Sequence, residues 1–458
     1  MKYLELATTS SLEALKAFTE AEVQALRGRF PEAIPSLKRA VELDPNFASA
    51  HALLAVIYFN MKQPRLAADY AEKGYALRDR VSEYEKFRVV SYYYGFVTGE
   101  ADKQIEVLEM QKQTYPRDFR APAMLATVYD ELRQSGKAVA EAIEAVRLNP
   151  DFAAAYRNLG LAFIQLNRFA EGKEVYERAL QQKLDLAGFH SGLYEIAFVS
   201  GDRAAMQHQL DWARGKPDEH MALDWQTGVA AFAGERRLAQ DFARRAIDLA
   251  IRSEAKEEAA RYAAEQALRA AVFGQFTSAK AAAAQSLALD RNQIPLTRAA
   301  LALAQSGEPS QVQSLIAELA KAHPKDTLLN GVWLPTIRAA MELRLGNAGQ
   351  AIDLLQAASR YEAAADFWPP YLRGQAYLRL ESGREAAAEF QKILDHRGEA
   401  PLSALYPIAH LGLARASALA GDITGSRKAY QDFLALWKDA DADLPVLVEA
   451  KKEYQSLK

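Results

Sequence analysis

The chain has 458 residues, of which 56 are basic and 59 acidic, so its formal net charge is -3. A charge so near balance argues against electrostatic binding of nucleic acid or of an anionic membrane surface. The chain has no cysteine, which excludes disulfides, thiol catalysis and thiolate metal sites.

The sequence shows no targeting or membrane segment. Residues Met1 to Tyr3 lead into LELATTSS without the apolar stretch of a secretory signal, and no segment approaches the roughly 18 apolar residues of a membrane helix. As written, the chain is therefore expected to be cytoplasmic, without membrane insertion.

Three segments that contain a proline near their end repeat one pattern. They are LKRAVELDPNF, MQKQTYPRDF and IEAVRLNPDF, with Pro45, Pro116 and Pro150. The last two prolines are 34 residues apart, a period typical of tetratricopeptide repeats, in which each repeat is a pair of helices. One pair cannot bury its apolar faces alone, so the pattern predicts an all-α, right-handed superhelical solenoid of about 11–12 stacked hairpins.

Five well-matched units are predicted over residues 1–184. Small residues alternate with bulky ones, because small residues let two helices approach and large ones fill the remaining space. In the fourth and fifth units the positions of this pattern are Leu125, Ala126, Tyr129, Ala138, Ala142, Tyr156, Leu159, Gly160, Phe163 and Tyr176.

The pattern is looser over residues 185–330, where we expect three divergent units between 187 and 292 and a ninth from Pro295 to Pro324. An irregular helical bundle is the alternative for this middle third, and the loose match predicts low local stability there. Residues 331–458 are predicted to hold three further units and an amphipathic C-terminal helix that caps the array.

Three stretches resemble a known family. The opening ATTSSLEALKAFTEAEVQALRGRFPEAIPSLKRAVELDPNFASAHALLA, the third unit SEYEKFRVVSYYYGFVTGEADKQIEVLEMQKQTYPRDF and the closing YQDFLALWKDADADLPVLVEAKKEYQSLK are similar to the tetratricopeptide half of bacterial eukaryotic-like serine/threonine kinases. Related arrays occur in bacterial winged-helix regulators. The resemblance covers nearly the whole chain.

The resemblance implies a sensor or docking half without catalysis. The chain has no Gly-rich nucleotide loop and no VAIK-like, HRD or DFG motif, so it cannot transfer phosphate. In that family the array lies beyond a membrane helix, which would place it outside the cytoplasm. We therefore expect a non-catalytic bacterial signalling module that needs no cofactor and no metal.

The expected ligand is a protein or peptide held in a concave groove. Such a groove is built from residues of the first helix of each unit that the packing pattern does not use, with aromatic anchors and an arginine for a carboxylate. The residues selected in this way are Tyr93, Phe96, Thr127, Asp130, Arg157, Asn158, Leu161 and Gln165. The alternative is that the aromatic residues pack between units and Arg157 is merely solvated.

A clamp for a peptide C-terminus is incomplete. Tetratricopeptide domains of that kind use lysine and asparagine at set positions in consecutive units, and Asn158 matches one position. The preceding unit offers Ala123 and Thr127 where lysine and asparagine are required, so binding of chaperone tails is disfavoured.

An acidic segment near the C-terminus partly matches a calcium loop. Asp439, Asp441 and Asp443 alternate as ligands would, but Leu444 and Ala450 replace the glycine and glutamate that an EF-hand requires. The favoured interpretation is an acidic linker that supplies negative charge to the start of the final helix.

Two other classes of function remain open. A hydrolase could use Asp218, Glu219 and His220 in the divergent middle, although these residues are expected to lie in a solvated loop between repeats. A self-assembling scaffold is also possible, because an uncapped repeat edge can stack on another copy. The sequence leaves the oligomeric state open.

Overall fold

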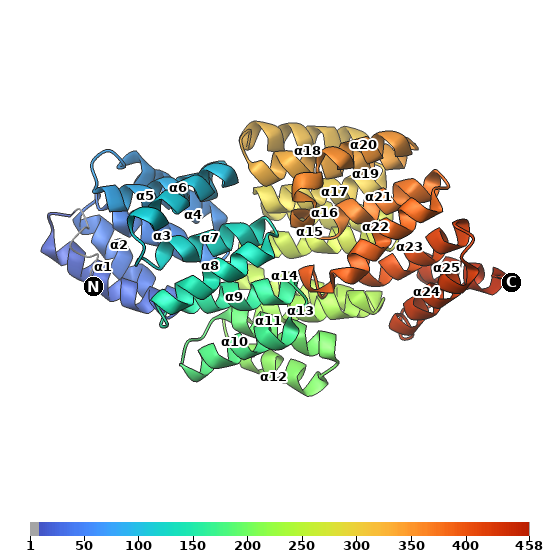
Figure 1. Cartoon of the computed structure of the whole chain (residues 1–458), viewed down its shortest axis with the longest axis horizontal. Helices are drawn as coiled ribbons and strands as arrows, with labels where there is room; N and C mark the ends of the chain where they lie inside the picture. The colour runs from blue at the N-terminus through green and yellow to red at the C-terminus, as the bar shows by residue number, and fades with distance from the viewer. Residues whose placement is uncertain (1–8, 458) are drawn as a thin grey trace. The chain divides into compact units, whose positions relative to one another are not determined.

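The computed structural model describes residues 9–457, which form helices and connecting turns without a β-strand (Figure 1). Most of the N-terminal segment assessed for a secretory signal lies in residues 1–8, outside the described residues. No helix within residues 9–457 has the length and apolar composition that crossing a membrane requires.

The described residues divide into two compact units. Unit 1 comprises residues 1–192 with 325–327, and unit 2 comprises residues 193–324 and 328–458. Each unit is an array of antiparallel helical pairs, in which we call the first helix A and the second helix B. The helices of the first five pairs are α1 Leu12–Leu26, α2 Phe30–Leu43, α3 Ala48–Asn60, α4 Pro64–Ala76, α5 Glu83–Tyr93, α6 Ala101–Thr114, α7 Arg120–Glu131, α8 Ser135–Leu148, α9 Ala153–Gln165 and α10 Phe169–Gln181.

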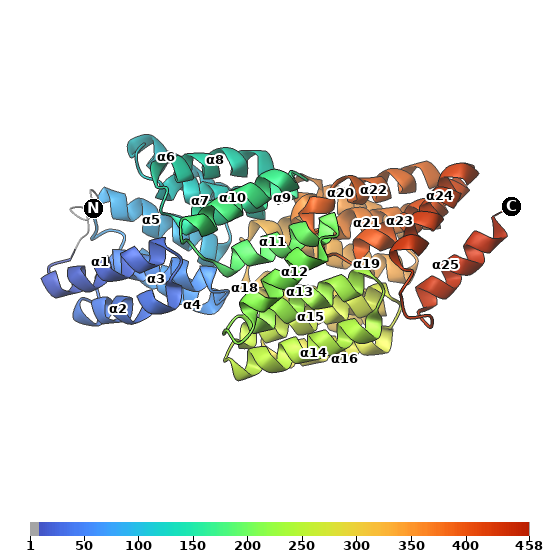
Figure 2. The ribbon, with the colours of Figure 1, turned by 90° about the horizontal axis from the view of Figure 1, so that it is seen from below.

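The remaining pairs continue in the same alternation (Figure 1 and Figure 2). Their helices are α11 Ala187–Ser200, α12 Arg203–Ala213, α13 Glu219–Phe232, α14 Arg236–Arg252, α15 Lys256–Val272, α16 Phe276–Leu289, α17 Gln293–Ser306, α18 Pro309–Ala322, α19 Leu334–Leu345, α20 Ala348–Ala357, α21 Trp368–Arg379, α22 Gly383–Asp395, α23 Leu405–Leu419, α24 Ile423–Leu436 and the final α25 Pro445–Ser456. Short 3-10 or π turns adjoin some of them, at Tyr94–Thr98, Leu329–Trp333, Ser359–Ala365 and Arg397–Glu399.

These helices confirm the predicted all-α array of hairpins. Residues 12–436 form twelve successive pairs, α1 with α2 through α23 with α24, and α25 follows them. The middle third, where an irregular bundle was the alternative, also consists of regular pairs from α11 to α18. The weak sequence match there reflects substitutions within the repeat and leaves the alternation of helices unchanged.

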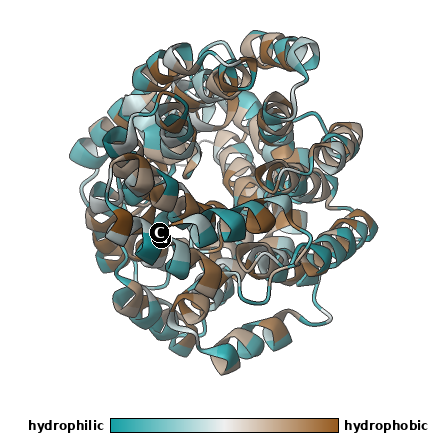
Figure 3. Cartoon of the chain, turned by 90° about the vertical axis from the view of Figure 1, so that its right-hand side faces the viewer, coloured by the Kyte–Doolittle hydropathy of each residue, from teal (hydrophilic) through white to brown (hydrophobic). Residues whose placement is uncertain are grey.

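Local sequence signals explain where several helices begin. Ser82 and Glu85 form a reciprocal capping box at the start of α5, which satisfies backbone N–H groups that lack a partner within the helix. The side chains of Ser11, Asp202 and Asp422 accept hydrogen bonds at the starts of α1, α12 and α24. Figure 3 shows helices that carry both hydrophobic and hydrophilic residues, as packing on one face requires.

Pairs of glycines admit the largest side chains of the core. Gly160 of α9 and Gly192 of α11 both face Tyr176 of α10, and a Cβ atom on either glycine would lie 2.2 or 2.3 Å from the tyrosine ring. In unit 2, Phe390 of α22 fills the same kind of notch between two glycines of α21 and α23. The alternation of small and bulky residues predicted from the sequence therefore lets neighbouring helices pack closely, because each bulky ring fills the space beside the small residues.

Successive A helices form the inner layer of each array. Helix α3 packs on α5, α7 packs on α9, and α15 packs on α17, while B helices such as α8 and α16 pack on the A helices on either side of them in the sequence. Because A helices of neighbouring pairs contact one another more than the B helices do, their remaining side chains line the inside of each curved array.

Unit 2 closes on itself through residues that are far apart in the sequence. The indole Nε1 of Trp437 donates to the carbonyl of Phe232 at 3.0 Å, and the backbone N–H of Asp441 donates to the carbonyl of Gly234 at 3.1 Å. Gly234 has φ +72°, and a Cβ atom there would lie 2.7 Å from the Cβ of Ala440. We call these contacts, between the α13–α14 turn and residues 437–443, the closure contact.

Candidate functional site

The clearest candidate site is a pocket on the inner layer of unit 1. Helices α3, α5, α7 and α9 contribute to it, and its free volume is about 50 Å³. The residues that line it are Val56, Phe59, Asn60, Tyr92, Arg120, Ala123, Met124, Thr127, Phe152, Ala154, Arg157 and Asn158. Most of these walls are apolar, and two arginines stand among them. A pocket of this kind suits one apolar side chain of a partner next to an anionic group.

Arg157 is the cation available in this pocket. Its Nε and Nη2 donate to the side-chain oxygen of Asn158 at 3.2 and 2.9 Å, and it forms no ion pair with a carboxylate among residues 9–457. Its side chain is partly exposed and also packs beside Gly188. A guanidinium whose neighbour is a neutral amide keeps donors free for a carboxylate.

The other arginine of the pocket is already paired. Arg120 donates to Glu22 of α1 and, at 3.4 Å, to the hydroxyl of Tyr84, and its Nη1 lies 3.2 Å from Asp118. Arg120 was not among the residues predicted from the sequence, because its partner Glu22 lies 98 residues away in the sequence. These bonds hold Arg120 as part of the wall.

Asn158 and Thr127 connect neighbouring A helices. The amide nitrogen of Asn158 donates to the carbonyl of Ala123 at 3.1 Å and to the hydroxyl of Thr127 at 3.0 Å, and Asn158 is only 3% exposed. The buried amide thus joins α9 to α7 and also accepts from Arg157. These hydrogen bonds fix α9 against α7 and orient Arg157.

Gln165 and Asp130 repeat this connection about two turns further along the same helices. Gln165 donates to the Asp130 carboxylate at 2.6 Å and accepts from the hydroxyl of Ser135 at 2.6 Å. Burial raises the pKa of Asp130, although Arg133 and Arg157 oppose the shift. Desolvation by the neighbouring helices and the charge of Asp130 raise the pKa of the adjacent Glu131 to about 7, and the exposure of this residue to solvent limits the effect of that shift on stability.

The predicted aromatic anchors pack between hairpins. Tyr93 stacks on Tyr75 with ring centroids 3.9 Å apart, and Phe96 stacks on Phe59 at 4.7 Å. Both are partly exposed, as is Leu161, and none of the three lines the pocket. Of the eight predicted groove residues, the pocket brings together Thr127, Arg157 and Asn158.

Sequence reasoning did not select the apolar walls of the pocket. Val56, Phe59, Met124 and Phe152 line it, from α3, from α7 and from the residue before α9. The spacing could have indicated some of these residues. Asn60 and Val56 are one helical turn apart on one A helix, and Met124 and Thr127 are one turn apart on another, so each pair lies on one helix face. The depth of the pocket depends on how the hairpins stack, which the spacing does not reveal.

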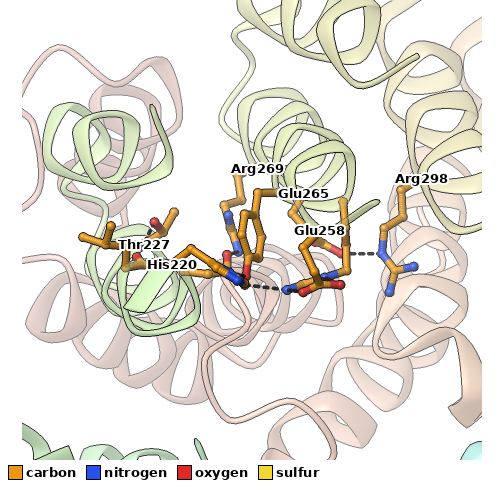
Figure 4. Close-up of polar contacts among 10 residues, drawn as sticks. His220, Thr227, Glu258, Glu265, Arg269 and Arg298 are labelled. Carbon is orange, nitrogen blue, oxygen red and sulfur yellow. Dashed lines mark hydrogen bonds and ion pairs between the residues drawn. The ribbon is translucent and has the colours of Figure 1, made fainter. Parts of the chain in front are cut away.

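The inner layer of unit 2 carries a row of paired charges (Figure 4). On α15, Arg261 lies 3.2 Å from Asp224 of α13 and 2.9 Å from Glu258, and Glu265 accepts from Arg298 of α17. Arg269 also approaches Asp224, at 3.7 Å. Burial raises the pKa of Glu265, but Arg298, Arg269 and Arg261 outweigh it and lower that pKa overall. We call these residues the charged row.

The segment proposed for a hydrolase lies only partly in the expected solvated loop, because Asp218 ends the exposed turn before α13 whereas Glu219 and His220 begin the helix. His220 is 6% exposed in the first turn of α13, and its Nδ1 lies 2.8 Å from the hydroxyl of Tyr262. Burial lowers the pKa of His220. Glu219 accepts from the backbone N–H of Gly215, and no hydrogen bond among the described residues joins Asp218, Glu219 and His220 to one another. His220 therefore belongs to the core, because Tyr262 gives its ring a buried partner.

The acidic segment before α25 also differs from its prediction. Asp441 accepts from the backbone N–H of Arg237 at 2.8 Å, at the start of α14, and Asp443 pairs with Arg236 at 3.0 Å. The residue before α25, Leu444, makes no side-chain cap. The carboxylates thus supply charge to α14, because the closure contact brings that helix start to them. Residues 9–457 contain no cluster of three or more acidic, histidine or cysteine residues that could hold a metal ion.

The helical pairs and their inner layer form an array of hairpins of the tetratricopeptide type. A family model described as TPR repeat matches residues 23–62, and one described as tetratricopeptide repeat matches residues 123–185 and 371–442. The prediction of tetratricopeptide repeats is thereby confirmed. The resemblance to kinase-associated arrays stays a prediction.

Several known proteins are similar to this chain. The type IV pilus assembly protein PilF of Pseudomonas aeruginosa is 30% identical over 155 residues, which are 34% of this chain and 48% of that protein. The chain thus spans about half the length of this curated relative. The crystal structure of PilW, a type IV pilus biogenesis factor, is 14% identical and covers 44% of this chain and 93% of that one, with a TM-score of 0.32. Yeast Tom70 is 12% identical and covers 97% and 95%, with a TM-score of 0.34.

Proposed function

We propose that the chain is a non-catalytic docking scaffold that binds a peptide segment of a protein partner in the pocket of unit 1. The observation that carries this proposal is the combination of apolar walls with a guanidinium that has no carboxylate partner among the described residues. An apolar side chain of the partner would enter between Phe59, Met124 and Phe152. A carboxylate next to it would accept hydrogen bonds from Arg157.

The mechanism of binding is preorganisation. Asn158 fixes α9 against α7 and holds the Arg157 side chain by two hydrogen bonds, so the protein loses little freedom when the partner binds. The flanking groove residues Tyr93, Phe96, Thr127, Asp130, Leu161 and Gln165 would act mainly by shaping this surface. Most of the conformational entropy lost on binding would then be lost by the partner peptide.

For the biological context we propose a bacterial multiprotein assembly. The identity with PilF supports a role related to pilus assembly, and the resemblance of the whole array to kinase-associated repeats supports a docking role in signalling. Proximity labelling in the native cell distinguishes the two contexts, since the first expects pilus assembly proteins among the neighbours and the second expects kinases or their substrates.

The test uses peptides of known sequence. A random peptide library would be selected on the full chain, and the selected peptides would be measured against the wild type, Arg157→Gln and Arg39→Gln. Arg39 is an exposed arginine of α2 in the same unit and controls for the loss of one charge. We expect peptides that combine an apolar residue with a carboxylate, and about 10-fold weaker binding to Arg157→Gln alone. Peptides that bind both variants as tightly as the wild type would contradict the proposal.

A further inference from the structure

An arginine of unit 2 lies on a cluster of aromatic rings. Arg397 follows α22 in the short turn Arg397–Glu399, and its guanidinium carbon lies 5.7 Å from the ring centroid of Phe198, 5.6 Å from that of Phe232 and 5.1 Å from that of Tyr406. These rings come from α11, α13 and α23, and they also contact one another. The cation therefore sits where three helices meet.

The charge of Arg397 has no carboxylate partner among the described residues. Its Nε–H is buried and donates to no acceptor within residues 9–457. Burial lowers the pKa of Arg397, and the only opposing influence on that pKa is the Tyr406 phenol. Arg397 is half-buried, and taking part of an arginine's charge out of water without a partner costs free energy.

Other enclosed arginines of unit 2 behave differently. Six of them have side chains that are 5 to 28% exposed, and each lies within 4.0 Å of an aspartate or glutamate of the same unit. They are Arg236, Arg261, Arg269, Arg298, Arg373 and Arg415. Most enclosed arginines of unit 2 therefore have a carboxylate partner, whereas Arg397 has none among the described residues.

Cation–π contacts compensate only part of the cost. These contacts are made to aromatic rings, so they provide no acceptor for the donors on the N–H edge of the guanidinium. That edge matches two oxygen atoms of one anionic group. The neighbouring His410, whose ring contacts Tyr406, adds no second positive charge near pH 7, because burial lowers its pKa.

We propose that Arg397 and its three aromatic rings form a binding site for an oxyanion that presents two acceptor oxygens, a carboxylate or a phosphate group. The aromatic faces of Phe198, Phe232 and Tyr406 hold the guanidinium in place, and its N–H edge donates to the anion. This site is distinct from the pocket of unit 1 and does not depend on the function proposed for that pocket.

Anion binding at this site stabilises the closed form of unit 2. Phe232 takes part both in the aromatic cluster and in the closure contact, where its carbonyl accepts from Trp437. A ligand that binds only the closed arrangement raises the stability of the unit by mass action. The closure of unit 2 therefore responds to the concentration of the anion.

The experiment measures thermal unfolding of the full chain in sodium chloride, sodium acetate and sodium phosphate at equal ionic strength and pH. The proteins are the wild type, Arg397→Met, Arg397→Lys and Arg203→Met. Arg203 is an exposed arginine in the same unit and controls for the loss of one positive charge. Arg397→Lys keeps the charge but cannot donate two parallel hydrogen bonds to one anion. This variant replaces Arg397→Met in the test if Arg397→Met does not fold.

We expect acetate or phosphate at about ten times the dissociation constant to raise the melting temperature of the wild type and of Arg203→Met by about 2–4 °C over chloride. This rise in melting temperature should vanish in Arg397→Met and be smaller in Arg397→Lys. The anion that causes the rise shows whether the site binds a carboxylate or a phosphate group. An equal rise in all four proteins, or no rise in the wild type with either anion, would overturn the proposal.

Discussion

The inner layers of the two units are built from the same kind of helix but carry different chemistry. In unit 1 the A helices are joined by buried side-chain amides, and the pocket keeps Arg157 without a carboxylate. In unit 2 the A helices are joined by the charged row, in which Arg261 and Arg298 neutralise Asp224 and Glu265. Repeat packing fixes only some positions of each A helix, so the remaining ones can connect hairpins or bind a partner.

The difference assigns different roles to similar residues. An arginine that the fold neutralises contributes to the stability of the array, whereas one left with a neutral neighbour is available to a ligand. Substitutions in the two units should therefore separate stability from binding.

The largest expected effect is on the closure of unit 2. Trp437 is 2% exposed and donates to Phe232, so Trp437→Ala should lower the free energy of unfolding of unit 2 by about 3–5 kcal/mol through the cavity and the lost hydrogen bond. Amide hydrogen exchange followed peptide by peptide would show faster exchange in α13 and α24. Trp437→Phe should have a smaller effect, and unchanged exchange in α13 with Trp437→Ala would show that closure does not depend on this contact.

A second effect concerns the charged row. Arg298→Met leaves Glu265 without its nearest cation, which should cost about 2 kcal/mol after allowance for partial exposure of both side chains. Glu265 has a lowered pKa in the folded state, so its contribution is present above its ordinary pKa near 4.5 and is lost as pH falls. Urea unfolding of the wild type and variant at pH 7 and pH 4 measures this, and an equal difference at both pH values would contradict it.

The buried amide of unit 1 gives a smaller effect. Asn158→Ala removes the hydrogen bonds to Ala123 and Thr127 and should destabilise unit 1 by about 1–2 kcal/mol. Arg157→Gln, at the partly exposed neighbour, should change stability by less than about 0.5 kcal/mol. Equal losses of stability in the two variants would contradict the assignment of Asn158 to connecting the helices and of Arg157 to binding.

The smallest effects are opposite responses to pH. Folding favours the protonated form of Glu131, so this stabilisation is complete below its ordinary pKa of 4.5 and is lost as pH rises through about 7. Because the side chain is open to solvent, the effect should be modest. Relative to Glu131→Gln, the wild type should lose stability between pH 5 and about pH 8 in thermal unfolding. A difference that does not change with pH would contradict the raised pKa.

In unit 2 the response should have the opposite sign. The pKa of His220 is lowered by burial, so its stabilising contribution is present above the ordinary pKa of 6.5 and is lost as pH falls below it. His220→Gln can keep a hydrogen bond to Tyr262 but cannot titrate. The wild type should therefore lose stability relative to this variant as pH falls from 7 to 5, and the reverse trend would show that His220 is charged in the folded protein.

Much of the fold could be predicted because repeat packing is local in the sequence. The small residues Gly160 and Gly192 lie one repeat apart around Tyr176, so a fixed period reveals the hairpins and their alternation. The divergent hairpins α11 to α18 kept enough of this alternation to be placed.

The site and the closure could be predicted only in part, because they depend on contacts that cross several repeats. Arg157, Asn158 and Thr127 were found from their positions on A helices, whereas the pairing of Arg120 with Glu22 spans 98 residues. Likewise, Asp441 meets Arg237 only because unit 2 closes, at a separation of 204 residues. Spacing within one repeat carries no information about such contacts.

The most direct test of the docking role is a double-mutant cycle between Arg157 and the carboxylate of a selected peptide. Fluorescence anisotropy would give the affinities of the wild type and Arg157→Gln for the peptide and for an analogue in which an amide replaces that carboxylate. If Arg157 binds the carboxylate, the two changes are coupled by about 1–3 kcal/mol, and the second change has little further effect. Fully additive losses would show that the carboxylate binds elsewhere and would contradict the pocket of unit 1 as the docking site.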